Sequence, residues 1–212
     1  MIELEVKFSV DHLPDECEGM RLVKEKTQKD YYYDTHSYDL LQGGNFLRVR
    51  DNQKLDFKLD MGDDSHLYCM ETSFRCEEVV EKMQDLKLIF DTLNVAFGDN
   101  VQYKDTEDLL KRNNLTMLAR IEKKRRVYEL ENINITMDQV EGLGCFVEAE
   151  IILSDQDDIT KGQAIELKDR LIKMLHDKKI IDSGSKEVKV GYVELYLMKY
   201  NLAAYELGKF KE

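Results

Sequence analysis

The fold of this protein is decided near the start of the chain, where residues 3–8 read Glu-Leu-Glu-Val-Lys-Phe. In a β-strand, residues two apart share a face. The two glutamates and the lysine therefore lie on one face of the predicted strand, and the three apolar residues lie on the other. A single strand of this kind needs only a core on one side and water on the other.

Several later segments repeat this alternation, and their charged faces tend to carry only acids or only bases, as in Arg48 with Arg50 and Glu148 with Glu150. Neighbouring like charges repel, so a solvated sheet gains nothing from this segregation. A closed sheet of about eight strands could use it, because its charged faces would converge on one small ligand. The candidate bases are Lys7, Arg48, Arg50, Lys58, Lys123 and Arg125, and the candidate acids are Glu3, Glu5, Glu71, Asp138, Glu148 and Glu150.

The two sets of charges indicate what such a lumen would hold. Arginine forks and lysine point charges suit a chain of phosphates. The acids would repel that chain unless a cation lay between them, and Mg²⁺ or Mn²⁺ is commonly held by one or two carboxylates while it bridges phosphate oxygens. The sequence therefore predicts a polyphosphate together with Mg²⁺ or Mn²⁺.

The rest of the chain is typical of an antiparallel sheet with a few helices. Helical periodicity covers residues 77–95 and 160–179, and a shorter helix is expected over 106–112. We expect one domain, residues 1–212, of the α+β class: mainly β, a closed eight-stranded antiparallel barrel with helices packed outside. The predicted strands are residues 2–10, 27–34, 46–51, 54–61, 67–75, 117–128, 133–140, 145–153 and 187–197.

Other polar and aromatic residues of these strands receive ordinary structural interpretations. Lys54, Asp56 and Asp60 lie near turns, where solvation is the expected fate. Tyr31, Tyr32 and Tyr33 cannot all face the lumen, so packing of the barrel is expected to account for them.

Composition excludes several classes of partner. The net charge of −12 argues against general attraction to nucleic acid. No segment is apolar enough to span a membrane, and no signal peptide is recognisable at the start. The four cysteines lack Cys-x-x-Cys spacing, so free thiols in a reducing compartment are expected. We expect a cytoplasmic monomer or homodimer that binds neither nucleic acid nor membrane.

The ordered motifs resemble those of the CYTH, or triphosphate tunnel metalloenzyme, superfamily. Residues 3–7 match its Glu-x-Glu-x-Lys signature, and residues 138–150 closely follow its Asp-x-Val-x-Gly-Leu-Gly-x-Phe-x-Glu-x-Glu run. The resemblance spans nearly the whole chain. Four shorter stretches also resemble family motifs. Residues 31–35 are similar to its Tyr-Tyr-Asp-Thr segment and residues 46–50 to its Leu-Arg-x-Arg strand. Residues 57–58 are similar to its next lysine strand, and residues 123–128 to its Lys-x-Arg-x-x-Tyr strand.

The resemblance implies a tunnel in which phosphoryl transfer relies on positioning and electrostatic stabilisation. It implies catalytic roles for Glu5, Lys58 and Arg125. The implied metal ligands are Glu3, Glu5, Glu71, Asp138, Glu148 and Glu150. The implied substrate-binding residues are Lys7, Arg48, Arg50, Lys58, Lys123, Arg125 and Lys189, the last being the base nearest to the family's final basic position.

Different stretches resemble different branches of the superfamily. Residues 77–117 and the tail of residues 196–200 with Tyr205 beyond look like thiamine triphosphatases, whereas residues 127–150 and 192–195 look at least as much like class IV adenylyl cyclases. Phe46 stands where vertebrate thiamine triphosphatases carry a tryptophan thought to stack on the thiamine ring, and Thr136 stands where they carry a second aspartate. Phenylalanine stacks more weakly than tryptophan.

We therefore expect a metal-dependent hydrolase that releases orthophosphate from inorganic tripolyphosphate or thiamine triphosphate. The alternative is an adenylyl cyclase that makes cyclic AMP and pyrophosphate from ATP. A third hypothesis, a non-catalytic polyphosphate-binding module, is disfavoured because anion binding alone gains nothing from the acids.

Overall fold

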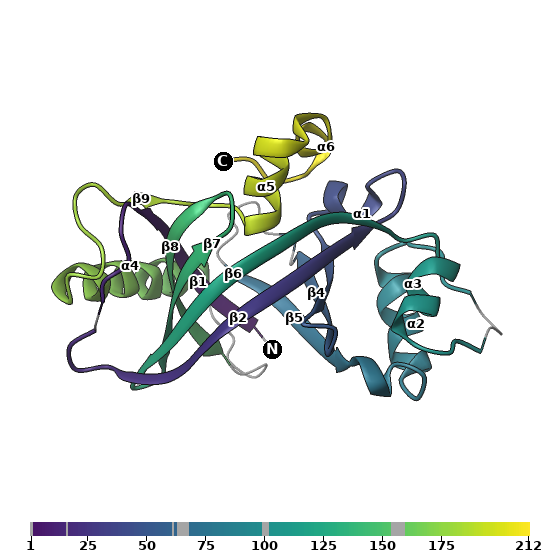
Figure 1. The fold of residues 1–212 in the computed structure, drawn as a ribbon, viewed down its shortest axis with the longest axis horizontal. Helices are drawn as coiled ribbons and strands as arrows, with labels where there is room; N and C mark the ends of the chain where they lie inside the picture. Colours follow the sequence, from purple (N-terminus) through teal and green to yellow (C-terminus); the bar gives the residue numbers. More distant parts are fainter. Residues whose placement is uncertain (1, 16, 61, 63–67, 99–101, 154–159) are drawn as a thin grey trace.

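A computed structural model describes residues 2–15, 17–60, 62, 68–98, 102–153 and 160–212, with only the backbone of Ile2, Glu3 and Tyr68. The chain folds around one antiparallel sheet, in which β2 and β6 are the longest strands and cross the middle of the molecule (Figure 1). The strands are β1 (Ile2–Val10), β2 (Arg21–Asp34), β3 (Phe46–Arg50), β4 (Lys54–Asp60), β5 (Tyr68–Arg75), β6 (Thr116–Leu130), β7 (Ile133–Val140), β8 (Gly144–Leu153) and β9 (Lys186–Glu187).

The strand order is β5-β4-β3-β2-β6-β7-β8-β1-β9, and β1 also pairs with β5. That extra pairing joins the first eight strands into a ring, but it covers only three residue pairs, from Ile2 with Met70 to Leu4 with Tyr68. Outside this short seam the sheet is an open half-barrel. The predicted antiparallel architecture is therefore confirmed, and the prediction of full closure is corrected to closure at one seam.

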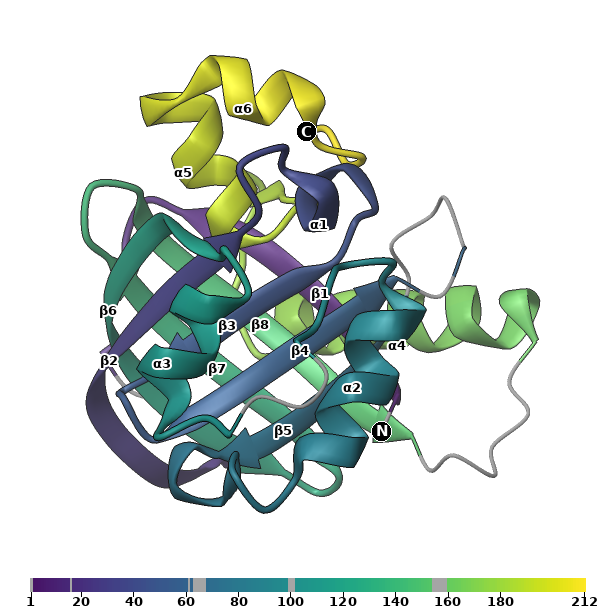
Figure 2. The ribbon, with the colours of Figure 1, turned by 90° about the vertical axis from the view of Figure 1, so that its right-hand side faces the viewer.

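Helices cover the outside of the sheet at both ends and close it from above (Figures 1 and 2). The pair α2 and α3 lies at one end, α4 lies at the other, and α5 with α6 sits over the middle. None of the helices in the described ranges has the length and apolar character needed to cross a membrane. The helices are α1 (Asp39–Gln42), α2 (Met83–Thr92), α3 (Thr106–Arg112), α4 (Lys161–Asp177), α5 (Tyr192–Tyr200) and α6 (Leu202–Leu207), with a 3₁₀ turn at Cys76–Glu78.

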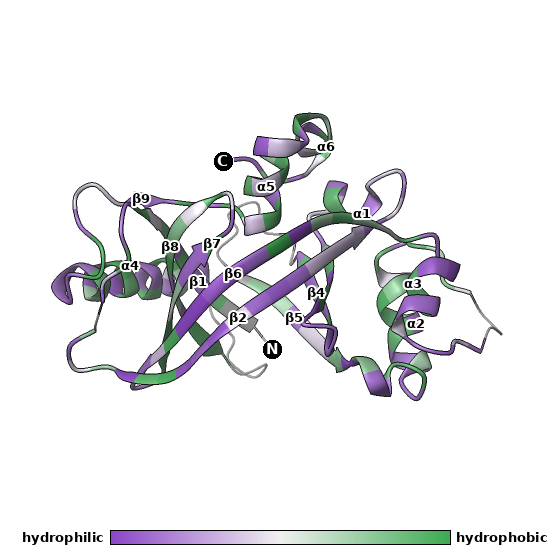
Figure 3. Cartoon of the chain, in the orientation of Figure 1, coloured by the Kyte–Doolittle hydropathy of each residue, from purple (hydrophilic) through white to green (hydrophobic). Residues whose placement is uncertain are grey.

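The alternation of apolar and polar residues along the strands explains where the cores form. Figure 3 shows hydrophobic residues interleaved with hydrophilic ones in both strands and helices. The even-numbered apolar residues of β1, Leu4, Val6 and Phe8, are buried together with Leu171 and Leu175 of α4. The odd-numbered charged residues of the same strand must then face the concave side. A second core is formed by the apolar residues of β3 and β4 with α2 and α3, and it contains Leu47, Val49, Leu55, Phe57, Leu86, Phe90 and Leu109.

Local signals fix the starts of two helices, α3 and α4. Thr160 and Gln163 form a capping box at the start of α4, in which the Thr160 hydroxyl accepts from the Gln163 N–H at 3.3 Å. The Asp105 carboxylate caps α3 by accepting from the Asp108 N–H at 2.8 Å. Both helices lie within or next to the ranges predicted from sequence periodicity.

The predicted last strand, residues 187–197, is wrong over most of its length. Only Lys186 and Glu187 pair with β1, and Gly191 is the N-cap of α5. Tyr192, Val193, Leu195 and Leu197 are then buried on the helix, because α5 covers the mouth of the half-barrel. The predicted helix over residues 77–95 is also shorter than expected, since α2 begins only at Met83.

Candidate active site

A cavity of about 740 Å³ opens on the concave side of the sheet and extends to α4, and the segment before α5 and the start of α5 cover it. All seven predicted substrate-binding residues line it: Lys7, Arg48, Arg50, Lys58, Lys123, Arg125 and Lys189. So do four of the six predicted metal ligands: Glu5, Glu71, Glu148 and Glu150. The side chain of Glu3 lies outside the described residues, and Asp138 is not part of the cavity lining.

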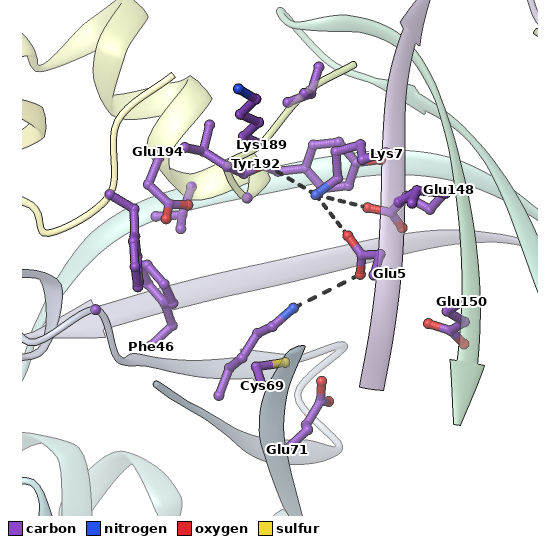
Figure 4. A pocket seen from close by; sticks show the side chains of 18 of the residues that line it. Glu5, Lys7, Phe46, Cys69, Glu71, Glu148, Glu150, Lys189, Tyr192 and Glu194 are labelled. Atoms are coloured by element: carbon purple, nitrogen blue, oxygen red, sulfur yellow. Dashed lines mark hydrogen bonds and ion pairs between the residues drawn. The ribbon is translucent and has the colours of Figure 1, made fainter. Parts of the chain in front are cut away.

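Strand geometry brings these groups together from β1, β3, β4, β5, β6 and β8. In β3, for example, Leu47 and Val49 are buried against α2 and α3, so Arg48 and Arg50 project into the cavity. Figure 4 shows how Glu5, Lys7, Glu148 and Glu150 approach one another from the neighbouring strands β1 and β8.

Arg125 and Asp138 form a bidentate ion pair beside the cavity. The guanidinium of Arg125 donates to both carboxylate oxygens of Asp138, at 2.7 and 2.5 Å, and to Glu148 at 2.6 Å. Burial alone would lower the pKa of Arg125, but Glu148 and Asp138 outweigh it and hold that pKa well above its usual value. The guanidinium therefore stays charged and fixed in orientation.

Asp138 is fully buried and does not line the cavity, and its role as a metal ligand stays a prediction. Besides Arg125, its oxygens lie 3.2 Å from Lys123 Nζ and accept from the Tyr192 hydroxyl at 2.9 Å. Three of these four contacts fall on one oxygen, Oδ2, so the carboxylate joins Arg125, Lys123 and Tyr192 in one buried cluster. In this arrangement Asp138 is the counter-ion that orients the bases.

The pKa of Lys123 lies below that of an ordinary lysine. Lys123 is buried, and burial together with the neighbouring Arg125 lowers its pKa to about 8, although Asp138, Glu148 and Asp30 act in the other direction. Its Nζ lies 4.5 Å from the centre of the Tyr192 ring. A lysine held in this state gains strongly from an added anion such as a phosphate.

Arg48 and Arg50 are held by Asp56 and Asp30, which were not among the predicted site residues, and Arg48 also donates to the predicted metal ligand Glu71 at 3.0 Å. Asp56 is only 1% exposed, and it pairs with Arg48 at 3.1 Å and with Arg50 at 3.5 Å, so the expectation that it is solvated is wrong. Asp30 pairs with Arg50 at 3.0 Å, and its pKa falls to about 2 because Arg48, Arg50 and Lys123 outweigh the effect of its burial. The sequence did contain a signal for Asp56: it alternates with the apolar residues Leu55 and Phe57, which predicts that it lies on the charged face of its strand.

Two tyrosines also belong to the site. Of the three consecutive tyrosines, Tyr32 is the one that lines the cavity, where Arg48 donates to its hydroxyl at 3.5 Å. Tyr192, at the start of α5, was missed because the segment was expected to be a strand. Its ring lies under Lys7 and Lys123, at 4.9 and 4.5 Å from their ammonium nitrogens, which places α5 directly on two of the predicted phosphate-binding bases.

Three glutamates gather where β1 runs beside β8, with Glu5 opposite Glu150 and Lys7 opposite Glu148. Lys7 Nζ lies 3.0 Å from Glu5 and 3.3 Å from Glu148, and these carboxylates raise the pKa of Lys7 above its usual value although its burial opposes them. Burial and then the charge of Glu5 raise the pKa of Glu150.

A divalent cation fits this glutamate cluster chemically, since facing carboxylates repel each other until a hard cation lies between them. No three acidic, histidine or cysteine side chains among the described residues already converge as a coordination site. Glu5 and Glu148 are instead paired with the lysine and arginine bases. Glu5, Glu148 and Glu150 are therefore the residues of this cluster that could hold a cation.

The fold and the cavity together define a class: an antiparallel half-barrel whose concave face is lined by arginines, lysines and glutamates. The chain belongs to the CYTH domain family, whose model matches residues 1–181. Proteins of this family are typically enzymes that act on triphosphates and generally depend on divalent metal ions.

Similarity to individual proteins agrees with this family. The chain is 24% identical to a Methanocaldococcus jannaschii protein named "putative adenylate cyclase", over 84% of this chain and 92% of that protein. A solved structure from Pyrococcus horikoshii has a TM-score of 0.63, with 23% identity over 93% of this chain and 99% of that one. A Hippeastrum protein, called a putative adenylyl cyclase with a dominant triphosphatase activity, has a TM-score of 0.54, with 19% identity over 99% of this chain and 97% of that one. At this identity both structures show the shared fold.

Proposed function

We propose that this protein is a divalent-metal-dependent hydrolase of a small triphosphate, which releases orthophosphate by in-line attack of water. The observation that carries the proposal is the convergence of Arg48, Arg50 and Arg125 with buried lysines in one cavity that also holds three neighbouring glutamates. The bases match a chain of phosphates, and the glutamates match a cation that bridges phosphate oxygens.

In this proposal the chain's own residues act mainly by positioning and by electrostatics. Arg48 and Arg50 hold one part of the phosphate chain, and Arg125 with Lys58 stabilises the charge on the phosphoryl group that is transferred. A bound Mg²⁺ or Mn²⁺, held by Glu5, Glu148 and Glu150, would neutralise phosphate charge and supply a more acidic water. Asp138 and Tyr192 keep the bases in place.

The triphosphatase activity reported for the Hippeastrum protein supports hydrolysis, since the two folds are similar over nearly all of both chains. The second candidate function is an adenylyl cyclase, which the name of the Methanocaldococcus relative favours. Both reactions need the same phosphate contacts, and they differ in the nucleophile: water in one case and the ribose hydroxyl of ATP in the other.

One set of assays separates the candidates. The protein is incubated with tripolyphosphate, thiamine triphosphate, ATP or GTP, each with Mg²⁺ or Mn²⁺, and orthophosphate, pyrophosphate and cyclic nucleotide are measured. Orthophosphate without cyclic product supports the hydrolase, whereas cyclic AMP with pyrophosphate from ATP supports the cyclase. Tight binding of triphosphate without any product would point to a binding module.

A matched pair of variants tests the role of the glutamates. Glu5→Gln keeps the size of the side chain but removes its charge, and we expect near-complete loss of turnover with phosphate binding partly retained. Glu25→Gln makes the same change at an exposed position of β2 and should leave turnover unchanged. Full turnover by Glu5→Gln would contradict the metal assignment.

A further inference from the structure

The strand β7 carries two polar side chains that the proposed hydrolysis does not use. Asn134 of β7 is opposite Glu150 of β8, and Thr136 is opposite Glu148. Directly opposite residues of an antiparallel pair point to the same side of the sheet. Asn134 and Thr136 therefore lie beside the glutamate cluster of Glu5, Glu148 and Glu150, which Figure 4 shows at the cavity.

Thr136 is bonded to the more deeply buried glutamate of β8. It is only 4% exposed, and its hydroxyl donates to Oε2 of Glu148 at 3.0 Å. The same oxygen accepts from Arg125 at 2.6 Å, whereas Oε1 of Glu148 lies 3.3 Å from Lys7 Nζ. Both oxygens of Glu148 are thus held in place, and Thr136 is the uncharged one of these three partners.

Asn134 is bonded to the other glutamate of β8. Its side-chain amide donates to Oε1 of Glu150 at 3.1 Å. An ionised carboxylate can only accept, so this contact orients the N–H₂ group of Asn134 toward Glu150. The strand β7 thus provides one uncharged donor to each glutamate of β8.

These donors lie behind the glutamates. Neither Asn134 nor Thr136 is part of the cavity lining, so both side chains act on the contents of the cavity through the carboxylates. An uncharged donor fixes the direction of a carboxylate without cancelling its charge, whereas Lys7 and Arg125 do both for Glu148. The negative charge of the glutamates therefore stays available for a cation.

We infer that Thr136 and Asn134 are positioning residues, which orient Glu148 and Glu150 for a divalent cation. The inference rests on the metal dependence in the proposed function, and it goes beyond that function by giving a role to two uncharged residues of β7. Side chains that hydrogen-bond to metal ligands fix the geometry of those ligands, and their loss typically weakens metal binding about 10–100-fold.

Binding of Mn²⁺ tests the inference without any turnover. Electron paramagnetic resonance measures the Mn²⁺ that remains free in a titration of each variant, with no triphosphate present. Thr136→Val removes the hydroxyl but keeps the shape of the side chain, and we expect its dissociation constant for Mn²⁺ to rise about 10–100-fold. Thr136→Ser keeps a hydroxyl and should retain most of the affinity. Asn134→Leu removes the other donor and should also weaken the binding of Mn²⁺.

The control is Thr27→Val, the same change at an exposed position of β2, which should leave the binding of Mn²⁺ unchanged. Binding of tripolyphosphate, measured by calorimetry without metal, distinguishes orientation of the glutamates from a general loss of structure. We expect Thr136→Val to bind tripolyphosphate like the unchanged protein, because Lys7 and Arg125 are retained. Weaker binding of both Mn²⁺ and tripolyphosphate, together with a lower melting temperature, would show that Thr136 only stabilises the sheet and would overturn the inference.

The other outcomes separate this inference from the proposed function. Equal dissociation constants for Mn²⁺ in the unchanged protein and in Thr136→Val would refute the inference alone, and so would a loss that Thr136→Ser does not reverse. Absence of Mn²⁺ binding by the unchanged protein would also refute it, whereas turnover that requires added metal would still support the hydrolase. Absence of turnover for every triphosphate would refute the hydrolase, and the dissociation constants for Mn²⁺ would then still decide about Thr136 and Asn134.

Discussion

Replacing Asp138 with asparagine should destabilise the protein strongly, because Asp138 neutralises two buried bases. The change removes one charge that receives two short hydrogen bonds from Arg125 and lies 3.2 Å from Lys123. The asparagine amide would also point its N–H₂ group toward Arg125 and Lys123, whose side chains can only donate hydrogen bonds. After the change, Arg125 would still have its ion pair with Glu148.

The magnitude follows from the burial of the cluster. Removing one partner of a buried ion pair typically costs about 3–5 kcal/mol. In a protein of this size, each kcal/mol lowers the melting temperature by roughly 2–4 °C, so we expect a fall of about 6–20 °C. Saturating tripolyphosphate should reduce the difference, because the added anion supplies the missing negative charge to the same bases.

The assay is urea and thermal unfolding of Asp138→Asn and of the unchanged protein, with and without tripolyphosphate. Asp85→Asn is the matched control, since Asp85 is exposed on α2 and should change stability by less than about 0.5 kcal/mol. The reasoning fails if Asp138→Asn unfolds like the unchanged protein and only requires more Mg²⁺ for activity. Asp138 would then be a metal ligand.

Two further predictions concern pH and the core. Because Lys123 has a pKa of about 8, it is protonated below that pH and loses its charge above it, so kcat/KM for a triphosphate should fall as pH rises through about 8. A pH-rate profile checks this prediction. The Lys123→Met variant should have lower activity, and its kcat/KM should not show the fall near pH 8. The same fall in the variant would assign the titration to another group. Leu171→Ala opens a space under α4 and should cost about 2–5 kcal/mol in urea unfolding, with turnover per folded molecule retained. Leu202→Ala, at an exposed position, is its control, and equal stability of the two variants would contradict the packing of α4.

Strand periodicity was the most informative property of the sequence. In β1 it assigned Leu4, Val6 and Phe8 to the core and the charged residues to the other face, and the structure has Glu5 and Lys7 in the cavity. This works because adjacent side chains of a strand must point to opposite sides, whatever surrounds the strand. The same rule brought the bases of β3, β4 and β6 to one cavity.

The prediction from sequence was wrong where the local pattern is compatible with both a strand and a helix. Residues 187–197 alternate well enough for a strand, but the run from Tyr192 to Leu197 also suits a buried helix. Pairing with β1 ends after Glu187, and contacts of Tyr192 with Lys7, Lys123 and Asp138 favour the helix. These partners lie far away along the chain, so no local pattern contains them.

The sequence by itself therefore determined which residues share a face, the antiparallel sheet and the set of bases and glutamates that could meet. Only the tertiary structure decided the partners of each charge: Asp56 and Asp138 are buried counter-ions. The physical reason is that periodicity depends on the geometry of neighbouring residues. Burial and pairing depend on what the curvature of the sheet and the placement of α5 bring opposite each side chain.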